Sequence, residues 1–183
     1  MPHERVQVAS EGGNSLGNVN RLITNIYERY SHLDLRVGDA PGVIIPMIRD
    51  VPQQILKRRP SPAKWSAYEH ACHLTTSDAL FRERLDLILS TQEPYIKSMA
   101  PTPEEEAGSY LDLDLDERLD AYVRERAALV ERLKTLSADE WQKTAEHEAF
   151  DHYSVFIMFR HLLNHEMLHA YRIEGLLLKK DWD

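Results

Sequence analysis

Apolar side chains recur at steps of three and four residues along four long stretches of the chain, about 16–36, 66–90, 115–136 and 153–179. This spacing places the apolar positions on one face of a helix. In the first stretch the face consists of Leu16, Val19, Leu22, Ile23, Ile26, Tyr27 and Tyr30. No stretch has a credible strand pattern, so we expect an all-α protein whose long helices form a bundle.

Three segments carry the sequence of a capping box, in which a serine or threonine and a glutamate three residues later exchange hydrogen bonds at a helix start. The pairs are Ser66 with Glu69, Thr102 with Glu105, and Ser137 with Glu140. The first pair is expected to open a long helix that runs to about position 90. The other two are expected to open short extra helical turns between the long helices.

The part of the chain before Pro60 is less regular. Residues 1–15 are polar and contain glycine, and they are predicted to form a loose N-terminal extension. The run 39–42 contains proline and glycine and is predicted to break the helix that begins near position 16. Residues 43–59 are then expected to form a second, shorter helical piece, interrupted or restarted near Pro52.

The length and net charge of the chain argue against some classes of binding partner. The chain has 183 residues, enough for a single domain spanning 1–183. Its formal net charge of −8 argues against a nucleic-acid binder and against docking on anionic membranes. We therefore expect a small-molecule substrate as partner, with no nucleic acid and no membrane.

The cysteine content and the length of the apolar runs indicate in which cellular compartment the protein is expected. Cys72 is the single cysteine, so no internal disulfide can form, which suits a reducing cytoplasm. The first ten residues hold charges and no apolar stretch of signal-peptide length. Apolar runs such as 43–48 are far too short to span a bilayer. A cytoplasmic location is the expectation.

Histidines are concentrated in the last helical stretch, where His161, His165 and His169 are spaced by four. Each step of four advances about 400° around a helix, so successive imidazoles point nearly the same way and a pair can chelate one metal ion. Two histidines rarely complete a site, so a third ligand must come from another helix. His70, Cys72 and His73 at the start of the 66–90 helix are the candidates, with Cys72 more typical of a small buried residue.

These residues also match the sequence motifs of two other kinds of metal site. The run 165–169 matches H-E-x-x-H, the zinc-peptidase helix in which the glutamate, here Glu166, is the general base. Only fourteen residues follow His169, and no sheet precedes the helix, which makes a peptidase unlikely. A di-iron bundle would need a second E-x-x-H motif, which neither Glu69 nor Glu83 begins.

Two parts of the chain resemble the DinB-like superfamily. The segment 59–66, with Trp65 before the helix, and the following Glu-His-Ala-Cys-His-Leu at 69–74 resemble the family's pre-helix tryptophan and second helix. The segment 136–141, then His147, and then the closing 161–169 run continue the same order. Together they make the resemblance fairly specific over about 60–178.

The resemblance implies an up-down-down-up four-helix bundle with one divalent metal ion on three histidines. The family's second-helix histidine falls on His73, and its closing pair falls on His165 and His169. Nickel or zinc is the expected ion, with iron or manganese as alternatives. Related proteins transfer low-molecular-weight thiols, so the leading hypothesis is a thiol S-transferase in which the metal activates the thiol for attack on an electrophile.

Other roles remain open from the residues alone. Metal-dependent hydrolysis of a small substrate is the near alternative. A third alternative is a non-catalytic, metal-stabilised bundle, and the apolar-rich region 154–178 could also support a homodimer. Glu166 is the candidate catalytic residue, with His161, Tyr68 and Asp78 as further candidates for a chemical role.

Overall fold

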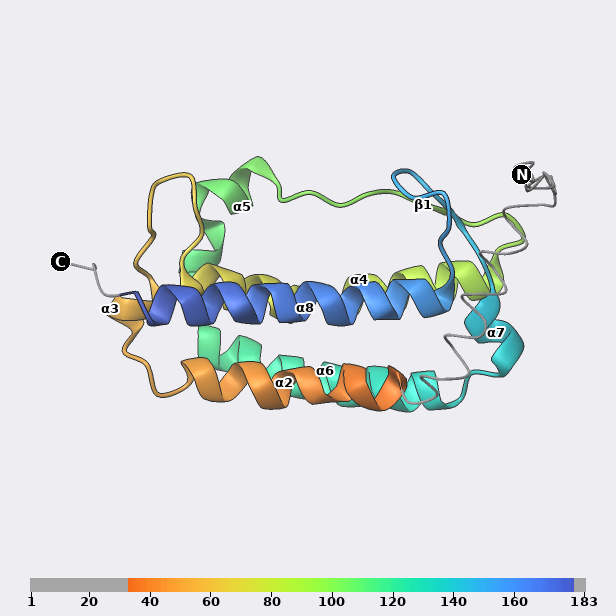
Figure 1. Cartoon of the computed structure of the whole chain (residues 1–183), viewed down its shortest axis with the longest axis horizontal. Helices are drawn as coiled ribbons and strands as arrows, with labels where there is room; N and C mark the ends of the chain where they lie inside the picture. Colours follow the sequence, from red (N-terminus) through yellow and green to blue (C-terminus); the bar gives the residue numbers. More distant parts are fainter. Residues whose placement is uncertain (1–32, 180–183) are drawn as a thin grey trace, which may run out of the picture. The chain divides into compact units, whose positions relative to one another are not determined.

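The computed structural model describes residues 33–179, in which four long helices pack into a bundle (Figure 1). They are α2 (Leu33–Ile48), α4 (Ala67–Ser90), α6 (Leu115–Lys134) and α8 (Val155–Leu177). Helices α4 and α6 run in one direction and α2 and α8 in the other, and α4 and α2 each pack against both α6 and α8. The expected all-α, up-down-down-up bundle is confirmed.

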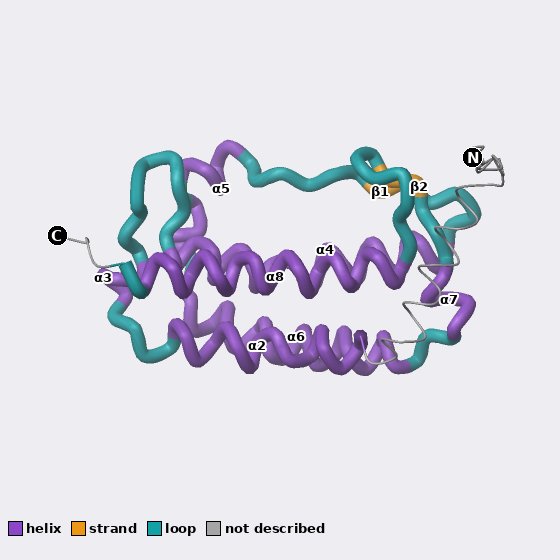
Figure 2. Tube along the Cα trace, in the orientation of Figure 1, coloured by secondary structure: helices purple, strands orange, loops and turns teal. Residues whose placement is uncertain are grey.

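Short elements connect the long helices, as Figure 2 shows. They are α3 (Gln53–Leu56), α5 (Pro103–Ala107), the 3-10 helix η1 (Ser109–Asp112) and α7 (Ala138–Gln142). Two strands of two residues each, β1 (Tyr95–Ile96) and β2 (Glu146–His147), pair in parallel. This pair ties the segment after α4 to the segment before α8, so both connections lie over the same part of the bundle.

All three predicted capping boxes form. In each of them the serine or threonine side chain accepts from the backbone of the glutamate, and the glutamate side chain accepts from the cap backbone. The box at Ser66 fixes where α4 begins and hence where its histidines lie. Gly108 links α5 to η1 with a φ of 114°, a left-handed conformation that glycine adopts without steric cost.

The prediction of a break at 39–42 is wrong, because α2 continues through Pro41. Proline has no N–H, so the carbonyl four residues earlier, that of Val37, loses its helical donor. Arg126 of α6 replaces that donor, since its Nη1 donates to the Val37 oxygen over 2.6 Å. The first bundle helix is therefore α2. The predicted helix 16–36 falls almost entirely outside the described residues, as does the loose extension 1–15.

The second predicted piece, 43–59, is divided in the structure, with α2 ending at Ile48 and α3 following Pro52. The bundle core holds side chains such as Leu74, Leu85 and Phe159, all of them 0% exposed. Cys72 is fully buried in this core, and burial raises the pKa of its thiol to about 12. Its interpretation as a small buried residue is consistent with this position.

Candidate metal centre

Three histidines from two antiparallel helices meet at one point. His73 comes from α4, whereas His165 and His169 lie one turn apart on α8. One ring nitrogen from each residue lies within 4.8 Å of the other two. The Nε2 atoms of His73 and His165 are 3.2 Å apart. The structure thus brings together the three residues that the resemblance singled out.

His73 is held by a chain of hydrogen bonds through its other ring nitrogen. Its Nδ1 lies 3.2 Å from the Tyr110 hydroxyl, and that hydroxyl donates to Oε1 of Glu105 over 2.5 Å. Because the tyrosine proton goes to the carboxylate, the hydroxyl accepts from Nδ1–H. This leaves the lone pair of His73 Nε2 directed at the other two histidines, the tautomer that a metal ligand requires.

His169 has an equivalent partner in His70. The Nδ1 atoms of the two rings are 2.9 Å apart, and both side chains are buried. Because Nδ1 of His169 takes part in this hydrogen bond, Nε2 is the ring nitrogen left to bind a metal ion. His165 differs, because its Nδ1 is buried without a partner among the described residues. Two of the three histidines are therefore oriented by hydrogen bonds.

Lowered pKa values keep the three imidazole rings neutral near pH 7. Burial, followed by the charges of neighbouring histidines and Arg172, lowers the pKa of His165 to about 4 and that of His169 to about 2. Burial also lowers the pKa of His73 to about 4, against the opposing charge of Glu105. Neutral rings keep the lone pairs with which metal ions are bound.

The donor set fits a divalent ion. Ligand nitrogens about 2.0–2.1 Å from a tetrahedral zinc ion lie roughly 3.3 Å from each other. The observed 3.2 Å between His73 and His165 agrees with that separation. Three protein ligands would leave a fourth position for substrate or water, which is typical of catalytic rather than structural zinc sites.

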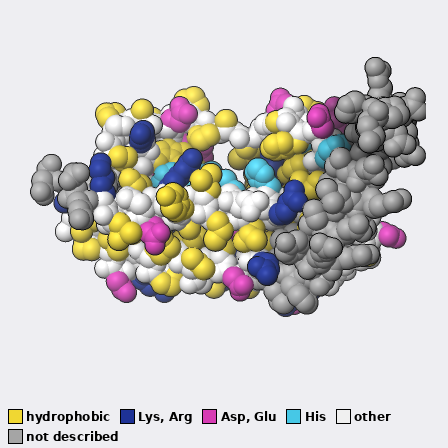
Figure 3. Space-filling model, in the orientation of Figure 1, with side chains coloured by type: hydrophobic (Ala, Val, Ile, Leu, Met, Phe, Trp, Pro, Cys, Tyr) yellow, Lys and Arg dark blue, Asp and Glu magenta, His cyan; other side chains and the backbone are white. Residues whose placement is uncertain are grey.

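The triad opens into a cleft of about 460 Å³. Figure 3 shows histidine side chains along a hollow in this face of the molecule. Beyond the triad the walls are largely apolar and aromatic, with residues such as Leu80, Phe81, Phe150, Tyr153 and Leu168. The volume suits a small organic molecule.

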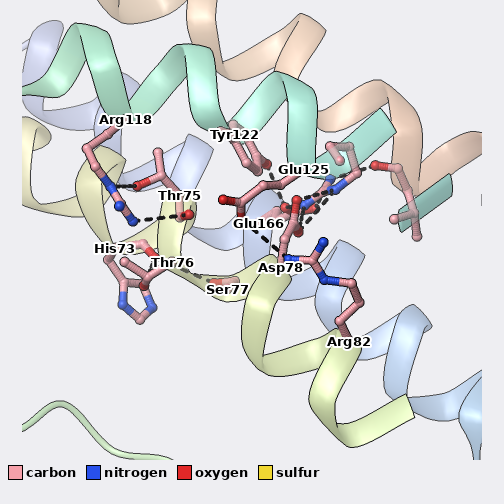
Figure 4. Close-up of polar contacts among 12 residues, drawn as sticks. His73, Thr75, Thr76, Ser77, Asp78, Arg82, Arg118, Tyr122, Glu125 and Glu166 are labelled. Atoms are coloured by element: carbon pink, nitrogen blue, oxygen red, sulfur yellow. Dashed lines mark hydrogen bonds and ion pairs between the residues drawn. The ribbon is translucent and has the colours of Figure 1, made fainter. Parts of the chain in front are cut away.

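Glu166, the candidate catalytic residue, does not line this cleft. It is fully buried on another side of α8, where it accepts from Tyr122 over 2.6 Å (Figure 4). It also pairs with Arg126. Arg126 also binds Asp78, with its Nε 3.1 Å from Oδ2. Burial raises the pKa of both carboxyl groups above the ordinary values, even beside Arg126. This geometry favours a structural role for Glu166 and Asp78 over catalysis.

The position of Glu166 also bears on the two rival motifs. A peptidase glutamate must face the substrate beside the metal, whereas this one faces a buried arginine. For a di-iron site, Glu69 is already bound by Arg59, whose Nε lies 2.9 Å from Oε2, and Glu83 is exposed. None of the three glutamates that these motifs would use, Glu69, Glu83 and Glu166, lies at the triad in the part of the chain that the structure describes.

The remaining candidates divide between the cleft and the core. His161 and His147 line the cleft but are not members of the triad. Tyr68 is buried and donates to the Leu113 carbonyl, so it packs rather than faces substrate. Trp65 lines the cleft and donates to the Glu105 carbonyl over 3.2 Å, while Trp141 is 6% exposed and packs under α8.

The sequence did not indicate the hydrogen-bond partners of the candidate metal ligands. His70, a candidate ligand from its position in the sequence, instead contacts Nδ1 of His169, and Tyr110, which contacts Nδ1 of His73, belongs to none of the sequence motifs. The capping box at Thr102 gave one signal, because it positions Glu105 and hence the hydroxyl of Tyr110. Nothing local indicated that this turn would reach the histidine at position 73.

Comparison with known proteins identifies the family. A search of curated protein sequences gave no match. Among solved structures, the chain is similar to YfiT from Bacillus subtilis, described as a probable metal-dependent hydrolase with an unusual four-helix bundle topology. The identity is 15%, with a TM-score of 0.71 over 85% of this chain and 90% of that one, a likeness in fold. The family model for the DinB superfamily matches residues 40–173. This chain therefore belongs to the DinB superfamily.

Proposed function

We propose that this protein is a metal-dependent enzyme whose divalent ion is held by His73, His165 and His169. The observation that carries the proposal is the convergence of three neutral ring nitrogens, within 4.8 Å of one another, at the wall of a cleft. Burial and hydrogen bonding have already oriented two of these rings. A site prepared in this way is expected to bind an ion with little rearrangement.

When bound, such an ion would supply a Lewis acid that makes a thiol or a water nucleophilic near neutral pH. Nickel or zinc is the proposed ion, and iron or manganese would also suit a histidine triad. The protein's own contribution is to hold the three rings, to keep them neutral and to shield the reacting groups from bulk water. Trp65 and Tyr110 close the wall of the cleft behind His73.

The leading proposal for the reaction is transfer of a small thiol to an electrophile. A carbon–sulfur bond forms, the leaving group departs with its electron pair, and the thiol proton is released to solvent or to a cleft base. The thiol must come from a co-substrate, because Cys72 is buried and does not line the cleft. His161, one turn before His165 on the cleft wall, is the residue best placed to accept the proton.

Hydrolysis of a small substrate is the second proposal. It is favoured by the fold shared with YfiT, which is described as a probable metal-dependent hydrolase. The same triad and cleft would serve, with water in place of the thiol. None of the described helices is long and apolar enough to cross a membrane, and a small molecule remains the proposed substrate.

The surface of α8 also supports pairing with a second copy. Met167 and Tyr171 on α8 and Leu178 at its C-cap recur at helical spacing and are 36%, 74% and 73% exposed. A homodimer along this face would bury them. Light scattering of the wild type and of Tyr171→Glu tests this directly, because the charge should convert a dimer to a monomer. A monomeric wild type would exclude the pairing.

The two reactions can be separated in one assay. Zinc-loaded and nickel-loaded protein is incubated with a small thiol and a haloaromatic electrophile, or with an activated ester alone. A transferase consumes thiol and electrophile in equal amounts and forms the thioether only when the metal is present. Release of acid from the ester without thiol would favour the hydrolase. Inactivity on both, with the ion bound, would favour the non-catalytic bundle.

A further inference from the structure

Arg172 lies on α8 three residues after His169, which is about 4.5 Å along the helix axis. Its side chain is exposed and lines the cleft that contains the triad. It also lines a neighbouring hollow on the far side of Trp65. The guanidinium therefore lies at the solvent-exposed edge of the cleft that contains the candidate metal centre.

Other arginines near the site are engaged by the protein itself. Arg84 donates to the Lys97 carbonyl over 2.7 Å, Arg59 binds Glu69, and Arg126 binds Asp78 and Glu166. Arg172, by contrast, has no hydrogen bond or ion pair with any residue in the range 33–179. Its charge acts on the site, since it contributes to the lowered pKa of His70, His165 and His169 after the larger effect of burial.

The charge of the cleft is opposite to that of the chain. The whole protein has 30 acidic and 22 basic residues, yet among residues 33–179 the cleft is lined by Arg84 and Arg172 against a single carboxylate, that of Glu105. Both oxygens of the Glu105 carboxylate already accept hydrogen bonds within the protein, Oε1 from the Tyr110 hydroxyl and Oε2 from the backbone N–H of Thr102. Figure 3 shows basic side chains beside the histidines of this hollow. A cationic cleft on an acidic protein is a feature that selects anions.

The rest of the cleft indicates the shape of such a ligand. Phe81, Phe150 and Tyr153 line the cleft. The rings of Phe150 and Phe81 contact His161 and Phe159, which precede the triad on α8, so these walls lie on the side of the triad away from Arg172. His161 lies at that end, eleven residues before Arg172 and hence about 16 Å away along α8. A molecule lying along the helix would meet a cation at one end, the triad in the middle and aromatic rings at the other.

We propose that the substrate carries a carboxylate or phosphate group, which Arg172 binds so that the reacting atom reaches the triad. The remainder of the substrate, apolar or aromatic, lies toward Phe150 and Tyr153. Guanidinium groups bind both kinds of anion through paired, charge-assisted hydrogen bonds, which add orientation to affinity. This inference rests on the proposed function, for which it names the substrate class.

Binding measurements on metal-free protein test Arg172 without interference from an ion. Phenyl phosphate, phenylacetate and the neutral phenylacetamide are titrated calorimetrically, in buffer without competing anions, into the wild type, Arg172→Gln and Arg172→Lys. Arg124→Gln is the matched control, because Arg124 is an exposed arginine on α6 away from the cleft. The titrations are then repeated with zinc-loaded protein.

We expect the wild type to bind at least one anion about tenfold more tightly than the amide. Arg172→Gln should remove this preference and leave the amide unchanged, Arg172→Lys should keep part of it, and Arg124→Gln should keep all of it. The more tightly bound anion identifies the substrate as a carboxylate or a phosphate.

Three results would overturn the inference: no anion binding by the wild type, equal affinity for anion and amide, or anion affinity that Arg172→Gln leaves intact. If anions bind only when zinc is present, and bind equally well to Arg172→Gln, the anion is bound by the metal and not by Arg172. That result would overturn this inference but would agree with the proposed metal centre. Conversely, loss of the metal proposal would not affect the metal-free titrations, so the two failures are distinguishable.

Discussion

His70 and His169, on two helices that run in opposite directions, face each other with their Nδ1 atoms 2.9 Å apart. The contact fixes the ring of His169 and directs its other nitrogen toward His73 and His165. Hydrogen bonds of this kind around metal-bound histidines set the tautomer, and losing one typically weakens metal binding by about 10–100-fold.

His70→Ala is therefore expected to lower zinc affinity by roughly tenfold or more without unfolding the protein. Competition with a chromophoric chelator measures the affinity, and circular dichroism checks the fold. His70→Asn, which can keep a polar group near Nδ1, should recover part of the loss. Equal affinities in wild type and His70→Ala would show that this contact does not orient a ligand.

Tyr110→Phe removes the hydroxyl between His73 and Glu105 while keeping the ring. We expect a loss of zinc affinity of about tenfold, since Nδ1 of His73 is then unpaired. Glu105→Gln should weaken binding less, and the double variant should be little worse than Tyr110→Phe alone, because both changes break one chain. Fully additive losses would contradict the chain of hydrogen bonds seen here.

Arg126 holds α2, α4, α6 and α8 together through Val37, Asp78 and Glu166. Arg126→Met removes the positive charge that pairs with two buried carboxyl groups, of which Glu166 keeps only the bond from Tyr122, and it removes the donor to the Val37 carbonyl. This is expected to cost about 3–5 kcal/mol of unfolding free energy. Urea denaturation measures the change. The exposed Arg124→Met on the same helix should stay within about 0.5 kcal/mol of wild type. Similar effects for the two arginines would refute the structural role assigned to Arg126.

The Arg59–Glu69 pair gives the fold a defined dependence on pH. Burial acts to raise the pKa of Glu69, but hydrogen bonds from Arg59 and Ser66 outweigh it, so the pKa lies below its ordinary value of 4.5. A group with a lowered folded-state pKa stabilises the protein above the unfolded pKa, and this stabilisation is lost as the pH falls through the folded pKa. The loss should therefore begin near pH 4.5 and grow below it.

Glu69→Gln isolates this effect. The difference in unfolding free energy between wild type and Glu69→Gln should be constant from about pH 6 to 8 and shrink as the pH drops below 4.5. Arg59→Gln should abolish most of the pH dependence as well. A difference that grows toward low pH would have the wrong sign for this pair.

The elements that depend on local chemistry were predictable from sequence. The capping boxes at Ser66, Thr102 and Ser137 locate helix starts because their partners lie three residues away. The spacing of His165 and His169 likewise determines that they share a face. His73 was singled out by a family resemblance, since residue spacing alone left the neighbouring His70 and Cys72 open.

Features that depend on distant partners were not predictable. Where α2 continues through Pro41, the freed carbonyl of Val37 accepts from Arg126, 89 residues later in the chain. Glu166 has the sequence context of a catalytic residue, but its environment is set by Arg126 and Tyr122 from another helix. In both cases a local pattern was overruled by a side chain that only the folded bundle brings near.

Metal content of the purified protein tests the central proposal most directly. Elemental analysis should find about one divalent ion per chain in the wild type, and the same in His161→Ala, which changes a cleft histidine outside the triad. His73→Ala, with the fold verified by circular dichroism, should lose the ion. Full metal content in His73→Ala, or none in the wild type after loading with zinc or nickel, would contradict the account.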